Sequence, residues 1–148
     1  MADDTGGWAV TYDRRARFSD CDAQGIVFNP NYLVYWDDTL TDWFDAIGLA
    51  WEDFVARGHE MVLARSEVDY RGSARLGDTV RTGLRLGRVG RTSLGFEMRS
   101  WRPDDGTVFV EGTLVQVVVD AETFRPTPVP EWLVELAAAA QADPPDRA

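Results

Sequence analysis

The sequence contains no lysine, one cysteine and one histidine. A single cysteine cannot form an internal disulfide, and the usual zinc sites would lack their Cys and His ligands, so we expect no structural metal. The chain also has no uncharged apolar stretch long enough to cross a bilayer. Residues 1–7 hold neither a basic segment nor an apolar run. These absences predict a cytoplasmic protein that does not enter a membrane.

Positive charge is scarce as well. All 15 basic residues are arginines, and 25 acidic residues outnumber them, which gives a net charge of −10. This charge opposes nucleic-acid binding, because a phosphate backbone requires a basic face. Arginine suits bidentate phosphate contacts, so a phosphate-bearing ligand would need a local arginine cluster. Any single arginine can equally be a solvent-exposed ion-pair partner of one of the excess acidic residues.

The apolar residues, 45% of the 148, are enough for one domain with a real core over residues 1–148. Their spacing predicts an amphipathic helix over residues 30–47, roughly 26 Å long. A helical turn or two at 51–57 and a short C-terminal helix at 131–140 follow from the same kind of pattern. Alternating patterns predict five strands, at residues 8–18, 61–70, 79–86, 92–98 and 108–119. Residues 1–7 and 141–148 are expected to be disordered tails.

The order of these elements is strand, long helix, then four strands joined by short turns. This order is typical of an α+β fold in which one dominant helix packs on an antiparallel sheet. One helix cannot cover both faces of a five-stranded sheet, and the sheet edges stay open. We therefore expect self-association as a two-fold homodimer, or as a tetramer built from two such dimers.

The segment 20–32 reads Asp-Cys-Asp-Ala-Gln-Gly-Ile-Val-Phe-Asn-Pro-Asn-Tyr and joins an acidic loop to the long helix. Pro30 suits a first helical position, and Asn29 before it can cap the free amides. A carboxylate held near uncapped helix N–H groups offers a base or nucleophile beside a place where an oxyanion is stabilised. The segment therefore predicts a small reactive site.

This segment resembles the signature of the hotdog-fold acyl-CoA thioesterases, in particular the 4-hydroxybenzoyl-CoA thioesterase type. The match is densest over residues 17–44, and the bend at 76–78 and the hairpin at 87–93 extend it over most of the chain. The resemblance implies a five-stranded sheet wrapped around one long central helix. It also implies hydrolysis of an acyl-CoA to a free acid and coenzyme A, without a metal or other cofactor.

By the same resemblance, Asp22 is the catalytic carboxylate and the Asn29 backbone amide polarises the thioester carbonyl. Asp22 could attack the thioester to give a mixed anhydride, or activate water as a general base, and the sequence leaves both routes open. Asp20 is expected to hold the loop in shape. Cys21 lies between two carboxylates, which raise the pKa of a thiol, so we interpret it as a packing residue.

The resemblance places substrate-binding residues at Gly25, Asp37, Met61, Arg88 and Arg91. Asp37 matches a position that contacts a phenolic hydroxyl, although an acid early in a helix is also favourable for dipole reasons. Met61 falls where a hydroxyl-bearing residue is found, and a thioether cannot replace that hydrogen bond, which favours a more apolar acyl group. Arg88 and Arg91 lie in the hairpin that faces the phosphates of coenzyme A.

Two other functions remain open. A hydratase or dehydratase of the same fold pairs a histidine with a carboxylate, but Val27 stands five residues after Asp22, and the lone His59 is expected in a loop or a dimer interface. A non-catalytic acyl-CoA or acyl-carrier binding module is the second alternative, because function depends on the site and not on the fold. The acyl group itself, aryl or aliphatic, also stays open.

Overall fold

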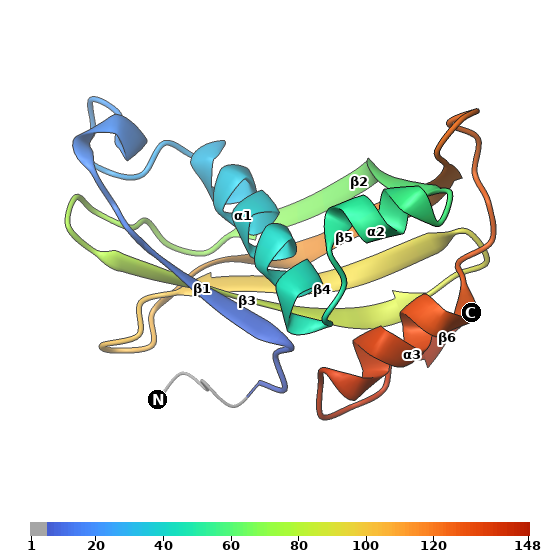
Figure 1. Ribbon diagram of the computed structural model, residues 1–148. Coiled ribbons are helices and arrows are strands. Elements are labelled where there is room, and N and C mark those ends of the chain that lie inside the picture. Colours follow the sequence, from blue (N-terminus) through green and yellow to red (C-terminus); the bar gives the residue numbers. More distant parts are fainter. Residues whose placement is uncertain (1–5) are drawn as a thin grey trace.

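The computed structural model describes residues 6–148, so the part of the predicted N-terminal tail before Gly6 lies outside the described residues. An antiparallel sheet of five main strands curves around the helix α1 (Asn31–Ala46), as Figure 1 shows. In spatial order the strands are β1 (Val10–Arg15), β3 (Thr79–Val89), β4 (Ser93–Trp101), β5 (Val108–Asp120) and β2 (His59–Tyr70). Two short helices, α2 (Trp51–Ala56) and α3 (Glu131–Ala139), complete the α+β fold predicted from the sequence.

The apolar stripe of α1 faces the inner side of the sheet and packs against it in the core. Trp36 and Trp43 are completely buried there. The indole N–H of Trp36 donates a 3.0 Å hydrogen bond to the Ser100 hydroxyl, which in turn lies 2.7 Å from the hydroxyl of Thr82. This small polar network ties the middle of the helix to β3 and β4, so the direction of α1 across the sheet is fixed.

The outer side of the sheet carries cross-strand ion pairs, such as Arg85 with Glu97 and Arg99 with Glu111. Trp8 also lies on this side and stacks on Trp101, with ring centroids 6.0 Å apart. A Cβ atom on Gly83 would lie 2.4 Å from the Trp8 ring, so only glycine leaves room for it. The charged outer side and the apolar inner side explain the alternating sequence pattern.

Two sequence-based expectations about the chain ends are wrong in detail. The predicted strand over 8–18 is shorter than expected, because the chain leaves β3 after Arg15 and forms a 3₁₀ turn, η1 (Phe18–Asp20). The other concerns residues 141–148, which lie against the sheet instead of forming a disordered tail. The side-chain amide of Gln141 accepts from the Leu86 N–H at 3.0 Å and donates to the Leu86 carbonyl at 2.8 Å.

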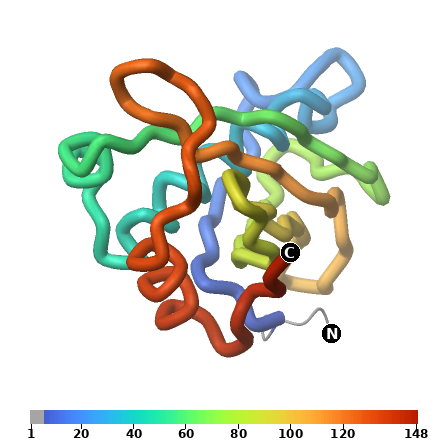
Figure 2. The backbone as a smooth tube through the Cα atoms, turned by 90° about the vertical axis from the view of Figure 1, so that its right-hand side faces the viewer, coloured from blue at the N-terminus to red at the C-terminus, as the bar shows by residue number. Residues whose placement is uncertain are grey.

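Beyond Gln141, the two-residue strand β6 (Asp146–Arg147) pairs parallel with the end of β3. The physical reason is an unpaired edge, because the register of β1 with β3 ends at Leu84 and leaves the backbone beyond it without a neighbour. Figure 2 looks at this end of the molecule and shows α3 and the last residues lying across it. Within residues 6–148, no helix combines the length and apolarity needed to span a membrane.

Candidate functional site

The loop between β1 and α1 is organised around the buried carboxylate of Asp20. The Arg14 guanidinium donates to both of its oxygens, at 3.0 and 3.2 Å, and the Arg17 N–H donates at 2.9 Å. Its backbone carbonyl accepts from the Phe28 N–H and from the Asn31 side chain, both at 2.8 Å. Burial alone would raise the pKa of Asp20, but the hydrogen bonds from Arg14 and Arg17 outweigh it and hold the pKa below its ordinary value.

Asp22 lies two residues further along, in a tight turn that Asp20 anchors. Its N–H donates to the Ile26 carbonyl, and its own carbonyl accepts from the Gly25 N–H, both at 3.0 Å. Gly25 has φ +74°, a left-handed conformation that glycine adopts without strain. One carboxylate oxygen of Asp22 accepts from the Gln24 N–H at 2.8 Å, and the other has no partner within residues 6–148. Asp22 is partly exposed, so its unpaired carboxylate oxygen is free to contact a ligand.

The start of α1 differs from the expectation in one respect. Pro30 occupies the N-cap position, and no side chain caps the helix, so the predicted capping by Asn29 is wrong. The Asn31 amide points back to the Asp20 carbonyl instead, which fixes the loop to the helix. Asn29 is an exposed residue, and its N–H donates no hydrogen bond within the described part of the chain. A free donor therefore lies at the positive end of the helix dipole.

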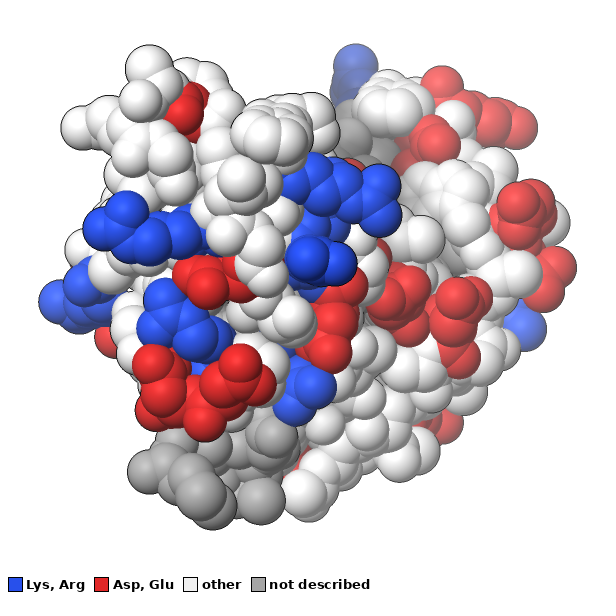
Figure 3. All heavy atoms as spheres, turned by 90° about the vertical axis from the view of Figure 1, so that its left-hand side faces the viewer, with Lys and Arg blue, Asp and Glu red and all other residues white. Residues whose placement is uncertain are grey.

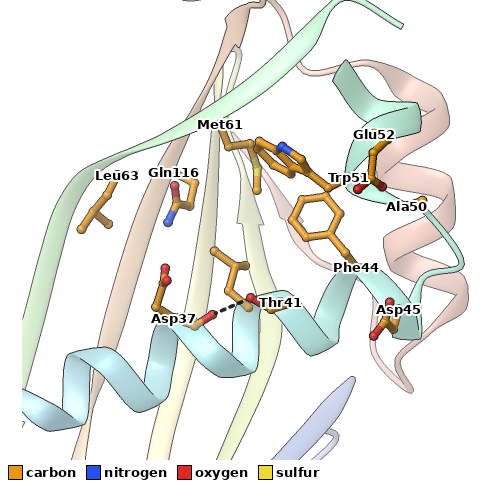
Figure 4. A pocket seen from close by; sticks show the side chains of 11 residues that line it. Asp37, Thr41, Phe44, Asp45, Ala50, Trp51, Glu52, Met61, Leu63 and Gln116 are labelled. Atoms are coloured by element: carbon orange, nitrogen blue, oxygen red, sulfur yellow. Dashed lines mark hydrogen bonds between the residues drawn. The ribbon is translucent and has the colours of Figure 1, made fainter. Parts of the chain in front are cut away.

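A cavity of about 530 Å³ opens between α1, α2, β2 and β5. Figure 4 shows Asp37 of α1 on one side of it, Met61 of β2 and Gln116 of β5 on the other, and the rings of Phe44 and Trp51 at one end. The structure thus brings Asp37 and Met61 together in the lining of one cavity. Asp22, Gly25 and Asn29 lie outside the cavity lining.

Gln116 was not predicted as a site residue. It is only 5% exposed, and it interrupts the apolar segment of β5 on the face that carries Leu114 and Val118. The signal available in the sequence was a polar residue at an inward position of a central strand, where an unpartnered amide would be costly.

Arg88 and Arg91 lie at the opposite end of the sheet from Asp22. Arg15, just before the Asp22 loop, pairs with Thr79 at the start of β3, whereas Arg88 pairs with Gly95 near its end. Nine residues of strand correspond to about 30 Å. Neither Arg88 nor Arg91 forms an ion pair among the residues described. A single chain therefore does not bring these arginines to the catalytic loop.

The end of the molecule that carries the Asp22 loop has arginines of its own. Figure 3 looks at this end and shows basic side chains gathered over its middle and left. Arg15 and Arg17 line a shallow groove with the exposed side chains of Phe18 and Leu76. Arg75 pairs with Ile26 in the loop itself through a backbone bridge. The family resemblance did not point to these three arginines.

Cys21 and His59 lie in settings that do not suit catalysis. Burial, together with the charges of Asp20 and Asp22, raises the pKa of the Cys21 thiol, which agrees with its interpretation as a packing residue. His59 begins β2 and stacks on Phe54 at 5.6 Å, with its Nδ1 buried and unpaired. Among the residues described, no three His, Cys, Asp or Glu side chains form a group that could hold a metal ion.

Comparisons with known proteins point to one family. Residues 16–136 match the family described as the thioesterase-like superfamily. The acyl-CoA thioester hydrolase YbgC of Escherichia coli O157:H7 is 24% identical over 120 residues, which are 81% of this chain and 89% of that protein.

Solved structures agree with this match. A thioesterase from Thermus thermophilus, complexed with coenzyme A and zinc, is 32% identical, with a TM-score of 0.78 over 91% of this chain and 96% of that one. A 1,4-dihydroxy-2-naphthoyl-CoA thioesterase from Synechocystis has a TM-score of 0.76 at 16% identity, over 85% and 93% of the two chains, and so shares the fold. The chain belongs to the thioesterase-like superfamily and has its hotdog fold.

Proposed function

We propose that the protein is an acyl-CoA thioesterase in which Asp22 carries out the chemistry. One observation carries this proposal. The same short loop holds the Asp22 carboxylate, which has one oxygen without a partner, and the Asn29 N–H, which donates no hydrogen bond within the described residues. The relatives named as acyl-CoA thioester hydrolases supply the class of substrate. Nothing in this reaction requires a metal, because the carboxylate provides the base or nucleophile and the helix N-terminus stabilises the oxyanion.

The reaction would proceed at the start of α1. The thioester carbonyl accepts a hydrogen bond from the Asn29 N–H, whose position at the helix N-terminus stabilises the developing oxyanion. Asp22 either attacks the carbonyl carbon, which expels the coenzyme A thiolate and leaves a mixed anhydride, or removes a proton from the attacking water. Water then completes hydrolysis of the anhydride in the first route. Both routes need the free oxygen of Asp22.

The active unit is proposed to be a homodimer joined through β2. This twelve-residue strand lies at an edge of the sheet, and most of its side chains are exposed. Antiparallel pairing of β2 with its own copy would reverse the direction of the second sheet. The hairpin with Arg88 and Arg91 of one copy would then approach the Asp22 loop of the other. This arrangement offers a reason why the predicted phosphate-binding arginines lie far from Asp22 within one chain.

The test is release of free thiol from a panel of aryl, short-chain and long-chain acyl-CoA substrates. The wild-type protein is expected to hydrolyse at least one class, and Asp22→Asn to lower kcat by about 10²- to 10⁴-fold. Asp104→Asn, which alters an exposed carboxylate with no hydrogen-bond partner among residues 6–148, should keep normal activity. Circular dichroism and sedimentation of each variant check that fold and assembly survive.

Near-normal turnover by Asp22→Asn would overturn the assignment. Calorimetric binding of an acyl-CoA without thiol release would instead favour the binding module. The hydratase alternative needs a histidine beside Asp22, and His59 packs against Phe54 and near Trp132, at the α2 and α3 end of the molecule. Loss of activity in His59→Ala without loss of structure would revive that alternative.

A further inference from the structure

The segment that follows β2 forms one side of the loop between β1 and α1. The Val27 N–H donates to the Ala74 carbonyl at 2.8 Å. The Ala74 N–H in turn donates to the Tyr32 hydroxyl at 3.0 Å. The loop is therefore held from two sides, by Asp20 within it and by residues 70–75 across from it.

One side chain of this segment reaches Asn29, the residue whose N–H is free. The hydroxyl of Tyr70, the last residue of β2, donates a 3.4 Å hydrogen bond to the Asn29 carbonyl. Tyr70 is 51% exposed, so its side chain borders the loop from the solvent side. The contact connects the edge strand β2 to the start of α1, although the two residues lie 41 positions apart in the sequence.

The Asn29 carbonyl belongs to a peptide group with few possible hydrogen bonds. This group joins Asn29 to Pro30, and proline has no N–H, so the carbonyl oxygen is its one hydrogen-bonding atom. Within residues 6–148 the carbonyl accepts one other hydrogen bond, a long one of 3.4 Å from the Tyr32 N–H. The hydroxyl of Tyr70 therefore adds a second attachment, directly at the residue that carries the free donor.

The Tyr70 ring is oriented by its neighbours, although about half of the residue is exposed. It meets the Tyr32 ring edge to face, with centroids 6.2 Å apart and an interplanar angle of 67°. Tyr32 is only 2% exposed and lies in the first turn of α1, so the Tyr70 ring packs on a rigid partner. The backbone after Tyr70 is also fixed, because the N–H groups of Arg71 and Gly72 both donate to the Phe109 carbonyl, at 2.8 and 3.0 Å. The hydroxyl is thus directed at the loop with a small loss of conformational entropy.

The position of the Asn29 N–H decides how well it can stabilise an oxyanion. A donor stabilises the transition state only when it is held at hydrogen-bond distance from the place where the charge develops. The loop offers little packing for this purpose, because residues 23–25 and 28–30 are all exposed. Its precision therefore depends on a few hydrogen bonds, and the one from Tyr70 acts on Asn29 itself.

We propose that Tyr70 is a positioning residue, which holds the Asn29 N–H in place through the hydrogen bond to the Asn29 carbonyl. The inference rests on the proposed thioesterase function and adds a residue of β2 to a site formed by the loop before α1. Tyr70 does not touch the reacting atoms in this role. A fixed donor is worth more to the charged transition state than to the bound substrate, so the hydroxyl of Tyr70 contributes to kcat and leaves KM unchanged.

The test is Tyr70→Phe, which removes the hydroxyl and keeps the ring that packs on Tyr32. With the best acyl-CoA of the substrate panel, kcat should fall by about 3- to 10-fold while KM stays the same. Thermal unfolding and sedimentation of the variant should match those of the wild type, because an exposed hydroxyl contributes little to the fold.

Thr113→Val is the matched control. It removes another hydroxyl hydrogen bond of 3.4 Å, from Thr113 of β5 to Glu67 of β2, which does not involve the loop. Both kinetic constants should stay at their wild-type values in this variant. An unchanged kcat in Tyr70→Phe, a rise in KM alone, or equal losses in the two variants would overturn the inference.

A measurement without turnover separates this inference from the proposed function. In ¹⁵N-labelled protein, the NMR order parameter of the Asn29 N–H should be lower in Tyr70→Phe than in the wild type and in Thr113→Val. The order parameters of the strands should be the same in all three proteins. A lower value at Asn29 supports the inference even if no thioester is hydrolysed. Thiol release that depends on Asp22, with the same order parameter at Asn29 in Tyr70→Phe, leaves the thioesterase assignment in place and rejects the role of Tyr70.

Discussion

The Asp20 loop and the Gln116 cavity each contain a buried polar residue, but the two side chains differ in their hydrogen bonds. Asp20 receives three hydrogen bonds from Arg14 and Arg17, all from within the chain. Gln116 receives none within residues 6–148 and faces an open cavity. A buried group that is hydrogen-bonded within the chain stabilises a fixed shape, whereas an amide that borders a cavity can be solvated there. The Asp20 side chain therefore belongs to the scaffold of its loop, and Gln116 belongs to the wall of the cavity.

Removing Arg14 should have the largest effect on stability. In Arg14→Met the buried Asp20 carboxylate loses its partner, and we expect the free energy of unfolding to fall by about 3–5 kcal/mol in urea titrations. Arg147→Met is the control, because its pair with Glu131 is exposed and is worth at most about 1 kcal/mol. Equal small losses in the two variants would show that Asp20 does not organise the loop.

The next comparison is between two glutamines. The side chain of Gln141 is hydrogen-bonded within residues 6–148, whereas the side chain of Gln116 is not. The Gln141 amide makes hydrogen bonds to both backbone groups of Leu86 and to the Asp143 carbonyl. Gln141→Met should lower the free energy of unfolding by about 1–3 kcal/mol, since it leaves the edge of β3 without these partners. An unchanged midpoint in denaturant would show that the C-terminal segment does not stabilise the sheet.

A smaller effect is expected for Gln116. Gln116→Met keeps the volume and removes an amide that borders the cavity and makes no hydrogen bond within residues 6–148, so the free energy of unfolding should change by less than about 1 kcal/mol. Gln24→Met, at an exposed position, should stay within about 0.5 kcal/mol of wild type. A clear loss of stability in Gln116→Met would mean that the amide already has a partner.

The smallest effect is a change in the pH dependence of stability. The pKa of Asp20 is lowered in the folded protein from its ordinary value of 3.8. Ionised Asp20 therefore stabilises the fold above that pH, and the contribution is lost as the pH falls through the lower, folded value. Between about pH 5 and pH 3, wild type should lose more stability than Asp20→Asn. Parallel curves for the two proteins would contradict the assigned pKa shift.

The sequence predicted the sheet and helix well because their signal is local. The alternation in the five strands and the spacing of Trp36, Leu40 and Trp43 in α1 reflect which face each residue presents, and the structure places them accordingly. The wrapping of the sheet around α1 followed from the family resemblance, whereas the spatial order of the strands came from the structure.

The features that the sequence did not predict depend on contacts between distant segments. The edge of β3 left open beyond Leu84 recruits residues 141–148, and nothing near Gln141 indicates that its amide would mimic a strand. The place of Gln116 in a cavity wall likewise depends on α1, because Asp37, 79 positions earlier, lies across the same cavity. The assignment of Arg88 and Arg91 to phosphate contact stays a prediction, because it depends on a second copy of the chain.

The two edges of the sheet are unequal, and this bears on how copies of the protein can assemble. β2 offers twelve residues, whereas β1 offers six, three of which are Asp13, Arg14 and Arg15. When β2 pairs with its own copy, the matching edges are used up and growth stops at two chains. Pairing of β2 with β1 of another copy would leave fresh edges at both ends and allow fibres to grow. The short, charged β1 is a poor match for β2, which favours the closed assembly over the open-ended one.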